Sequence, residues 1–258
     1  MLNERQRKIL LELVKQYNHL YQSEPDLKKY SEYAITYHST AIEGSTLTEN
    51  EVIELLDIGK PAKKREFLHN LMVFDHHKAL QYIVESAKQK EKITEKQIKN
   101  ISAMVMKNTG SQYNTAAGNF DAGKGEYRLV GVHAGKRTFP GYRKVPALMK
   151  KLIEYIDSEQ EKQDVDVLQL AFEVHFRFVS IHPFIDGNGR AARLLMNYIL
   201  AYYGLPMLIV SRSDRLKYID TLYQAQENGN MIPFYNFMLR QYIRFLKYEI
   251  KQHGTVDK

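Results

Sequence analysis

The sequence has 258 residues, of which 44% are hydrophobic and 26% are charged, and these proportions are ordinary for a globular protein with a sizeable core. It contains no cysteine, which excludes disulfide bonds and thiolate metal sites and fits a reducing compartment. The net charge of +7 is compatible with nucleic acid, acidic proteins or nucleotide phosphates, but the lysines and arginines are scattered, which favours a solvated basic surface.

A membrane span is not expected. The best candidate, residues 194–210, is short for a bilayer and is interrupted by Asn197, Gly204 and Pro206. The first ten residues, MLNERQRKIL, are charged and lack the apolar core of a signal peptide. We therefore expect a cytoplasmic protein without membrane association.

Two helices are predicted at the start of the chain. Apolar residues recur at helical spacing from Leu2 to Tyr21, which predicts a helix with one buried face. Pro25 is well suited to the first position of a second helix, which we expect to run to about Glu43 and to stop at Gly44.

Two capping boxes open further helices. A glutamate or glutamine follows three residues after Thr48 and Thr94, which predicts helices over 49–58 and 94–108. Between them, the apolar spacing predicts a long helix over 63–90, whose expected buried residues include Phe67, Leu71, Phe74 and Leu80.

Residues 109–140 are rich in glycine, alanine and turn-forming residues. The one alternating run, residues 127–133, is expected to form a hairpin with residues 137–139 through a turn at 134–136. A helix is then predicted over 146–159, followed by a charged linker that ends at residue 166.

The next two helices enclose a short loop. Residues 167–181 are apolar at helical spacing and contain no glycine or proline, so they predict a buried helix. Because Pro183 disfavours a helical residue before it, this helix is expected to end at His182. A second buried helix is predicted over 190–203, closed by Gly204.

The loop between these helices has the features of an anion site. Gly187, Asn188 and Gly189 allow tight turns that lead into a helix N-terminus, where unpaired amides and the helix dipole attract negative charge. Arg190 and Arg193 are three residues apart on the following helix, so both guanidinium groups are expected to reach phosphate oxygens.

Two further side chains add chemistry to this loop. Asp186 offers a hard oxygen ligand that suits Mg²⁺ between two phosphates. His182 titrates near neutral pH and suits the acceptance of a proton from an attacking hydroxyl. Each feature alone is common in structural roles, but their coincidence within residues 182–193 indicates phosphate-ester chemistry on a nucleotide.

The stretch HPFIDGNGRAAR, residues 182–193, resembles the HPFx[D/E]GNGRxxR motif of Fic-domain proteins, with every fixed position present. Most enzymes that carry this motif transfer AMP from ATP to a protein hydroxyl. The resemblance implies that His182 is the general base and that Asp186 is the Mg²⁺ ligand. It also implies a set of nucleotide-binding residues, namely Gly187, Asn188, Gly189, Arg190 and Arg193.

A second, shorter motif lies nearer the N-terminus. Residues 39–44, STAIEG, resemble the [S/T]xxxE[G/N] inhibitory motif of the Fic proteins that carry it on an N-terminal helix. The resemblance implies that Glu43 pairs with Arg193 and repels the γ-phosphate of ATP, with Ser39 and Gly44 as further regulatory residues. The plainer alternative is a solvent-facing glutamate at a helix end.

Two weaker resemblances concern the substrates. Residues 125–132 and 139–149 resemble the Fic flap, a hairpin that clamps the target by strand addition, which implies docking of the target near residues 127–139. The family often has a second proline where Gly141 stands. A helix is predicted over 214–227, and the resemblance implies that Tyr218 on it and Asn228 just after it contact the nucleobase. For Tyr218, a role in packing is an equally good interpretation.

We therefore expect an all-α protein, a Fic-like helical domain with a small β-hairpin flap. The expected organisation is an N-terminal segment with the inhibitory helix (1–60), a catalytic domain (61–250) that ends in a helix over 233–248, and a tail (251–258).

The expected function is a protein adenylyltransferase that uses ATP and Mg²⁺, modifies a serine, threonine or tyrosine of an unknown target protein, and is inhibited by Glu43. Two alternatives stay open: removal of AMP from a modified protein by a water that Glu43 orients, or a nucleotide-sensing regulatory module. Self-modification and a homo-oligomer are compatible with the sequence, whereas nucleic-acid binding is a weaker interpretation.

Overall fold

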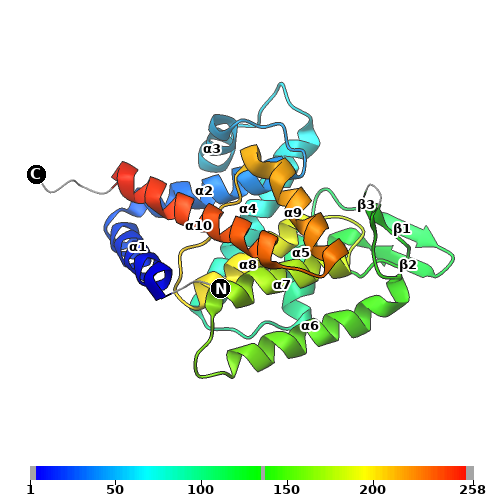
Figure 1. Cartoon of the computed structure of the whole chain (residues 1–258). Coiled ribbons are helices and arrows are strands. Elements are labelled where there is room, and N and C mark those ends of the chain that lie inside the picture. The colour runs from blue at the N-terminus through cyan, green and yellow to red at the C-terminus, as the bar shows by residue number, and fades with distance from the viewer. Residues whose placement is uncertain (1–3, 135–136, 254–258) are drawn as a thin grey trace, which may run out of the picture.

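The computed structural model describes residues 4–134 and 137–253, and helices make up most of it (Figure 1). In this part of the chain the α-helices are α1 (Glu4–Ser23), α2 (Pro25–Ile42), α3 (Glu49–Ile58), α4 (Phe67–Lys88), α5 (Glu95–Val105), α6 (Val145–Gln160), α7 (Val167–Ile181), α8 (Asn188–Tyr202), α9 (Arg215–Asn228) and α10 (Ile232–His253). The antiparallel hairpins are β1 (Gln112–Thr115) with β2 (Gly118–Asp121) and β3 (His133–Ala134) with β4 (Arg137–Thr138). The expected all-α fold is confirmed.

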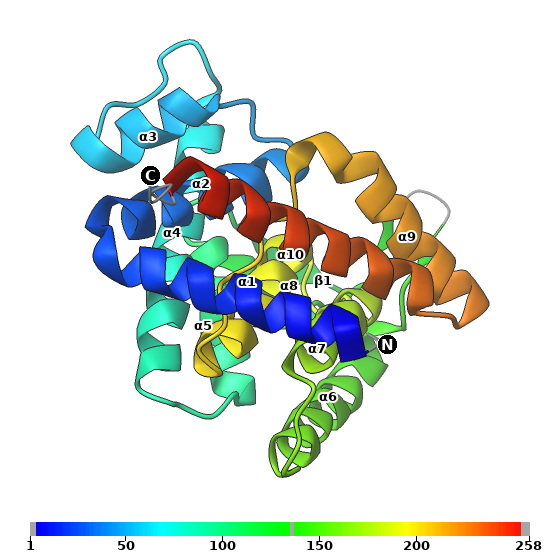
Figure 2. The same cartoon turned by 60° about the vertical axis from the view of Figure 1, so that its left-hand side comes forward.

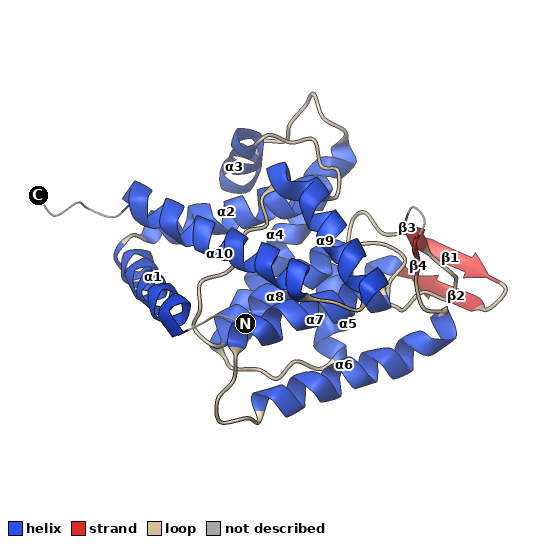
Figure 3. Cartoon of the chain, in the orientation of Figure 1, coloured by secondary structure: helices blue, strands red, loops and turns tan. Residues whose placement is uncertain are grey.

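Helices α7 and α8 pack against each other at the centre of the fold, and α4 and α5 cover another side of α8. Every residue of α8 from 190 to 200 is buried, because most of them are apolar and the three polar ones, Arg190, Arg193 and Asn197, have hydrogen-bond partners inside the fold. Helices α1 and α10 pack together across this centre (Figure 2), and α1 and α2 contribute to the same buried cluster as α7 and α8. The strands gather at the side away from α1 (Figure 3). Among the described helices, none is long and apolar enough to cross a membrane.

Some predicted helix boundaries were wrong. Helix α4 begins at Phe67 rather than at residue 63, because the preceding loop is held by polar contacts, including a hydrogen bond from the Ala62 N–H to Asn70 Oδ1 (2.8 Å). Phe67 and Phe74 are exposed, in contrast to the prediction, whereas Leu80 is fully buried. At the other end of the chain, α10 continues beyond the predicted residue 248 to His253.

The predicted strand over 127–133 is largely absent. Residues 127–132 are irregular, and only His133 and Ala134 pair with β4. The reason is Arg128, whose buried guanidinium group donates hydrogen bonds to the carbonyl oxygens of His182 (2.8 Å), Val130 (2.7 Å) and Pro140 (2.6 Å). These bonds tie the segment to the loop after α7 instead of to a strand ladder. The predicted turn residues 135–136 lie outside the described residues, and the hairpin β1–β2 was not predicted.

Buried histidines should make this fold sensitive to acid. Burial lowers the pKa of His38, His77 and His182 to about 4 and that of His175 to about 3, and it lowers the pKa of His76 well below 6.5. Between pH 6.5 and these lowered pKa values, the unfolded chain binds more protons than the folded chain. The contribution of the buried histidines to the free energy of unfolding is therefore complete above pH 6.5 and is lost as the pH falls. We expect the free energy of unfolding, measured with urea, to decrease by on the order of several kcal/mol down to about pH 4.5.

A variant pair isolates this effect. His76 is fully buried, and within the described chain neither of its ring nitrogens has a hydrogen-bond partner. His76→Leu should therefore flatten the dependence on pH, whereas the same change at the exposed His19 should leave it unchanged. An unchanged slope in His76→Leu contradicts the assignment.

Candidate active site

His182 lies where α7 ends. Its backbone is left-handed (φ 51°), and its N–H still donates to the carbonyl oxygen of Phe178 (3.0 Å), so the helix closes here as predicted. The imidazole ring stacks on the ring of Phe139, with centroids 3.9 Å apart. Burial lowers the pKa of His182 to about 4, and the nearby positive charges of Arg128 and Arg137 act in the same direction. The imidazole is therefore neutral at physiological pH and free to accept a proton.

The loop leads into α8 through Gly187, whose backbone is left-handed (φ 76°). A Cβ atom at Gly187 would lie 2.8 Å from Sδ of Met106, so both conformation and space require glycine. The Asn188 side chain closes the loop, because it accepts from the Phe184 N–H (3.0 Å) and donates to the Phe184 carbonyl (2.9 Å). The loop is thus fixed before any ligand arrives.

In the described part of the chain, the N-terminus of α8 has unpaired backbone amides. Within the described residues, the backbone amides of Asn188, Gly189 and Arg190 have no hydrogen-bond partner, as expected for the first turn of a helix. These amides and the helix dipole present positive charge to the same space. The backbone at the start of α8 therefore has the geometry on which the predicted anion site depends.

The two arginines of the motif have different surroundings. Arg190 is 1% exposed and lies under the loop, where its Nη1 donates to the carbonyl oxygen of Val105 (3.3 Å) and its Nη2 lies 3.1 Å from Sδ of Met106. Its Nε atom is buried and has no partner within the described chain. Helix spacing placed Arg190 and Arg193 on one face, but the end of α5 covers the first of them.

Arg193 is held by the end of α2 and the residue after it. Its Nη2 donates to Oε1 of Glu43 (2.8 Å) and to the carbonyl oxygen of Ser39 (2.8 Å), and its Nε donates to Oγ of Ser39 (2.9 Å). Its Nη1 lies 3.4 Å from the hydroxyl of Tyr218. Arg193 as a whole is 5% exposed, so these partners replace the hydration of its guanidinium group.

Glu43 places a negative charge beside the start of α8. It follows the last residue of α2, and Gly44 turns the chain away with φ 103°. A Cβ atom added to Gly189 would overlap with Oε1 of Glu43, so the carboxylate lies directly against the start of α8. Burial raises the pKa of Glu43, but the charge of Arg193 and its hydrogen bond, with Arg190 and Arg215, outweigh burial and leave the pKa below its ordinary value. The carboxylate is therefore ionised.

Tyr218 and Asn228, the expected nucleobase contacts, lie apart. Tyr218 is 1% exposed, and its hydroxyl lies 2.8 Å from Nε2 of His175 as well as near Arg193. The Tyr218 hydroxyl thus contacts Arg193 and His175 inside the fold. This agrees with the alternative that Tyr218 is a packing residue rather than a nucleobase contact. Asn228 is the exposed last residue of α9. His175 was missed because its place in an apolar helix gave no signal.

A cavity of about 740 Å³ is lined in part by Phe139, whose ring stacks on that of His182. Its walls come from the hairpin β3–β4 and the residue after it, from α7, and from the end of α9 with the turn after it. Arg137, Phe139 and Gln226 are among its lining residues. The volume lies in the range of small-molecule sites, but none of residues 182–193 lines this cavity.

Asp186 is the carboxylate of the loop. Its side chain is 70% exposed, its Oδ1 accepts from the Gly187 N–H (2.6 Å), and its Oδ2 lies 3.8 Å from Nη2 of Arg190. Within the described residues, no group of three or more histidine or acidic side chains is arranged to hold a metal. One exposed carboxylate fits Mg²⁺ that takes its other ligands from phosphates and water, so the residues present suit the metal only together with a nucleotide.

Residues 92–200 match the model of the Fic/DOC family. This chain contains a Fic domain. It is 32% identical over 212 residues to the protein adenylyltransferase Fic of Drosophila grimshawi, an alignment that covers 82% of this chain and 41% of that protein. The chain therefore spans about two fifths of the length of this relative.

Solved structures agree with this fold. A Fic domain containing signaling protein from Bacteroides thetaiotaomicron superposes with a TM-score of 0.81 at 27% identity, covering 94% of this chain and 96% of that one. Residues 134–508 of Fic-1 from C. elegans superpose with a TM-score of 0.76 at 22% identity, covering 95% of this chain and 71% of that one, which supports the fold alone.

Proposed function

We propose that this protein is a protein adenylyltransferase, which transfers AMP from ATP to a serine, threonine or tyrosine hydroxyl of a target protein. The observation that carries the proposal is the junction of α7 and α8, where a neutral imidazole, three unpaired amides and a buried arginine converge. The Fic domain and its similarity to a named adenylyltransferase support the same chemistry.

In the proposed reaction, His182 accepts the proton of the target hydroxyl while that oxygen attacks the α-phosphorus of ATP. A phosphorus–oxygen bond to the target forms, the bond to the β-phosphate breaks, and pyrophosphate leaves. The amides at the start of α8 hold the phosphate oxygens as charge develops on them. Asp186 is the residue that would hold Mg²⁺, which, when bound, neutralises phosphate charge.

The target segment is proposed to dock on the hairpin β3–β4. Main-chain groups of an extended peptide pair with such an edge, and the sequence after β4 brings Phe139 onto the ring of His182. A hydroxyl on that peptide would then lie beside the base.

The resting enzyme is proposed to be self-inhibited. Glu43 occupies Arg193, which would otherwise hold the γ-phosphate, and its ionised carboxylate lies against the start of α8. Both effects oppose the productive placement of a triphosphate, because like charges repel in a partly desolvated site. Ser39 strengthens the inhibition by holding Arg193 toward α2.

One observation favours the removal of AMP as a second candidate. The Glu43 side chain is ionised and keeps 34% of its surface exposed beside the anion site. A carboxylate in this position is suited to orient a water molecule toward the phosphorus of a modified hydroxyl. The same site would then act as a hydrolase.

Label transfer tests the proposed function. The Glu43→Gly variant is incubated with Mg²⁺ and ATP labelled at the α-phosphate, alone or with a protein mixture. Either the variant itself or a protein of the mixture should acquire the label and gain the mass of AMP. ATP labelled at the γ-phosphate should give no labelled protein, which distinguishes AMP transfer from phosphorylation. If neither label transfers although ATP binds, the adenylyltransferase proposal fails. Release of AMP from a modified protein by the parent, lost in Glu43→Gly, would support the hydrolase instead.

A further inference from the structure

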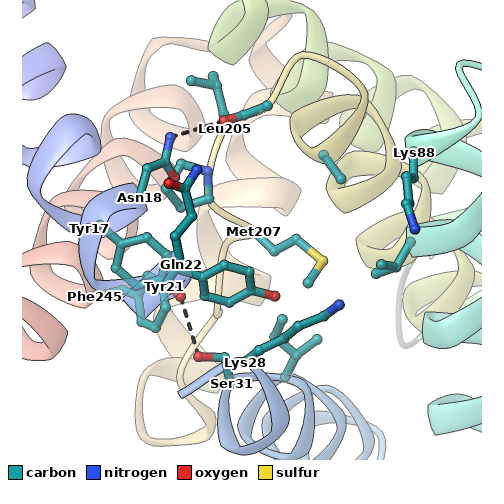
Figure 4. A pocket seen from close by; sticks show the side chains of 15 residues that line it. Tyr17, Asn18, Tyr21, Gln22, Lys28, Ser31, Lys88, Leu205, Met207 and Phe245 are labelled. Carbon is teal, nitrogen blue, oxygen red and sulfur yellow. Dashed lines mark hydrogen bonds between the residues drawn. The ribbon is translucent and has the colours of Figure 1, made fainter. Parts of the chain in front are cut away.

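A second cavity, of about 330 Å³, lies between α1, α2, α4, α10 and the end of α8 (Figure 4). None of the residues that line it belongs to the site around Arg193. Ile35, Met207 and Phe245 form an apolar wall and are each at most 9% exposed. A volume of this size with an apolar wall suits a small organic molecule.

Several polar groups of the cavity already have partners. The Tyr17 hydroxyl lies 3.3 Å from Oγ of Ser31, and Asn18 donates to the carbonyl oxygen of Gly204 (3.3 Å). The hydroxyl of Tyr21, by contrast, points into the open space in Figure 4 and has no hydrogen-bond partner within the described chain. Tyr21 is therefore available to donate to a ligand.

Two lysine side chains line this cavity. Lys28 comes from α2 and Lys88 from α4, and in Figure 4 their amino groups lie beside the space in front of Met207. Within the described residues, neither amino group makes a hydrogen bond or a direct ion pair. Lys28 has a longer-range attraction to Glu32, one turn later on α2, where it lowers the pKa of a carboxyl that burial raises. Two lysines that line an apolar cavity without a direct ion pair in the described chain match a ligand that has an anionic group and an apolar body.

We propose that this cavity binds a small molecule with one anionic group and an apolar body. The anionic group would lie between Lys28 and Lys88 with the Tyr21 hydroxyl as a further donor, and the apolar body would cover Met207 and Ile35. Charge complementarity selects this ligand over a neutral one of the same shape.

The position of the cavity connects it to the inhibitory contact. Ser31 and Ile35 line the cavity, and Ser39 and Glu43 follow at four-residue steps along the same side of α2. The opposite wall includes Ala201 near the end of α8, the helix that begins at the anion site. The cavity thus depends on α2 being docked on α8, the arrangement that keeps Glu43 on Arg193.

A ligand that fills this cavity stabilises the arrangement that forms it. Resting on the proposed function, this makes the ligand an inhibitor that acts together with Glu43 and weakens the binding of ATP. By linkage, ATP weakens the binding of the ligand by the same factor.

The binding step is tested with octanoate as the probe, 1-octanol as its neutral counterpart and octyl phosphate as the alternative anion. Titration calorimetry on the full chain should show octanoate or octyl phosphate binding more tightly than octanol. The double variant Lys28→Gln, Lys88→Gln should lose about tenfold in affinity for the anion. Lys150→Gln on α6 is the matched control and should change nothing. Equal binding of octanol, or anion binding that survives the double variant, overturns the site.

The regulatory step is measured separately. The bound anion should weaken ATP binding to the parent about fivefold and should leave ATP binding to Glu43→Gly unchanged. An equal effect in both proteins, or none in the parent, overturns the connection through α2. Because anion binding is measured without ATP, a failure of the proposed adenylyltransferase function would not be mistaken for a failure of this site.

Discussion

Replacing Glu43 with glycine should strengthen the binding of ATP by about ten- to a hundredfold, with a matching rise in AMP transfer at low ATP concentrations. In the parent, the carboxylate is bonded to Arg193 (2.8 Å) and lies against the start of α8, where a phosphate would bind. ATP must therefore displace an ionised group from a nearly buried arginine before it binds productively. Calorimetric titration with ATP and Mg²⁺, together with initial rates, measures the gain.

Two further variants separate the causes of this inhibition. Glu43→Gln keeps the volume of the side chain and removes its charge, so it should recover most of the affinity if electrostatic repulsion dominates and little if occupied space dominates. Ser39→Ala should give a smaller gain, because Arg193 loses the bond to Oγ (2.9 Å) but keeps the bond to the Ser39 carbonyl (2.8 Å). The exposed Glu49→Gln is the control and should behave as the parent.

The same variant should be less stable without nucleotide. Arg193 remains buried in Glu43→Gly with fewer acceptors, which costs about 1–3 kcal/mol of unfolding free energy. Bound ATP supplies new acceptors and should raise the melting temperature of the variant more than that of the parent. Unchanged ATP affinity in Glu43→Gly would contradict the proposed inhibition, whatever its stability.

The sequence predicted the part of this site that depends on neighbouring residues. Pro183 ends α7 through its effect on the residue before it, and Gly187 is required by the turn into α8, so both helix ends were expected from local rules. The start of α8 is two positions earlier than the predicted residue 190, because Asn188 binds the backbone of Phe184 and begins the helix itself.

Contacts between distant parts of the chain were not predictable by such rules. Arg128 was part of an alternating run that predicts a strand, yet its side chain is consumed by loop carbonyls, including that of His182. The stacking of Phe139 on His182 and the bond of His175 to Tyr218 likewise depend on how helices and loops meet. The pairing of Glu43 with Arg193 was expected only through the resemblance to a known family, since no spacing rule connects residues so far apart.

Replacing His182 should reduce AMP transfer by about 10²- to 10⁴-fold while ATP binding persists. The choice of replacement matters, because His182 has a left-handed backbone (φ 51°) in which most side chains are strained. Asparagine tolerates this conformation better than alanine and cannot accept the proton as imidazole does. His182→Asn, made in the Glu43→Gly background so that the starting rate is measurable, therefore tests the base with the least change in the loop.

The pH dependence gives an independent measure of the same role. Because burial holds the pKa of His182 at about 4, the imidazole is already neutral above about pH 5, and the transfer rate should not fall until the pH drops through that pKa. An acid limb near the ordinary value of 6.5 would instead indicate an exposed imidazole in the working enzyme. Phe139→Ala should move the limb toward that value, since it removes the ring that covers His182 on one side (3.9 Å between centroids). Transfer at the parental rate in His182→Asn would show that another group takes the proton, and the loop after α7 would then serve only to position the phosphates.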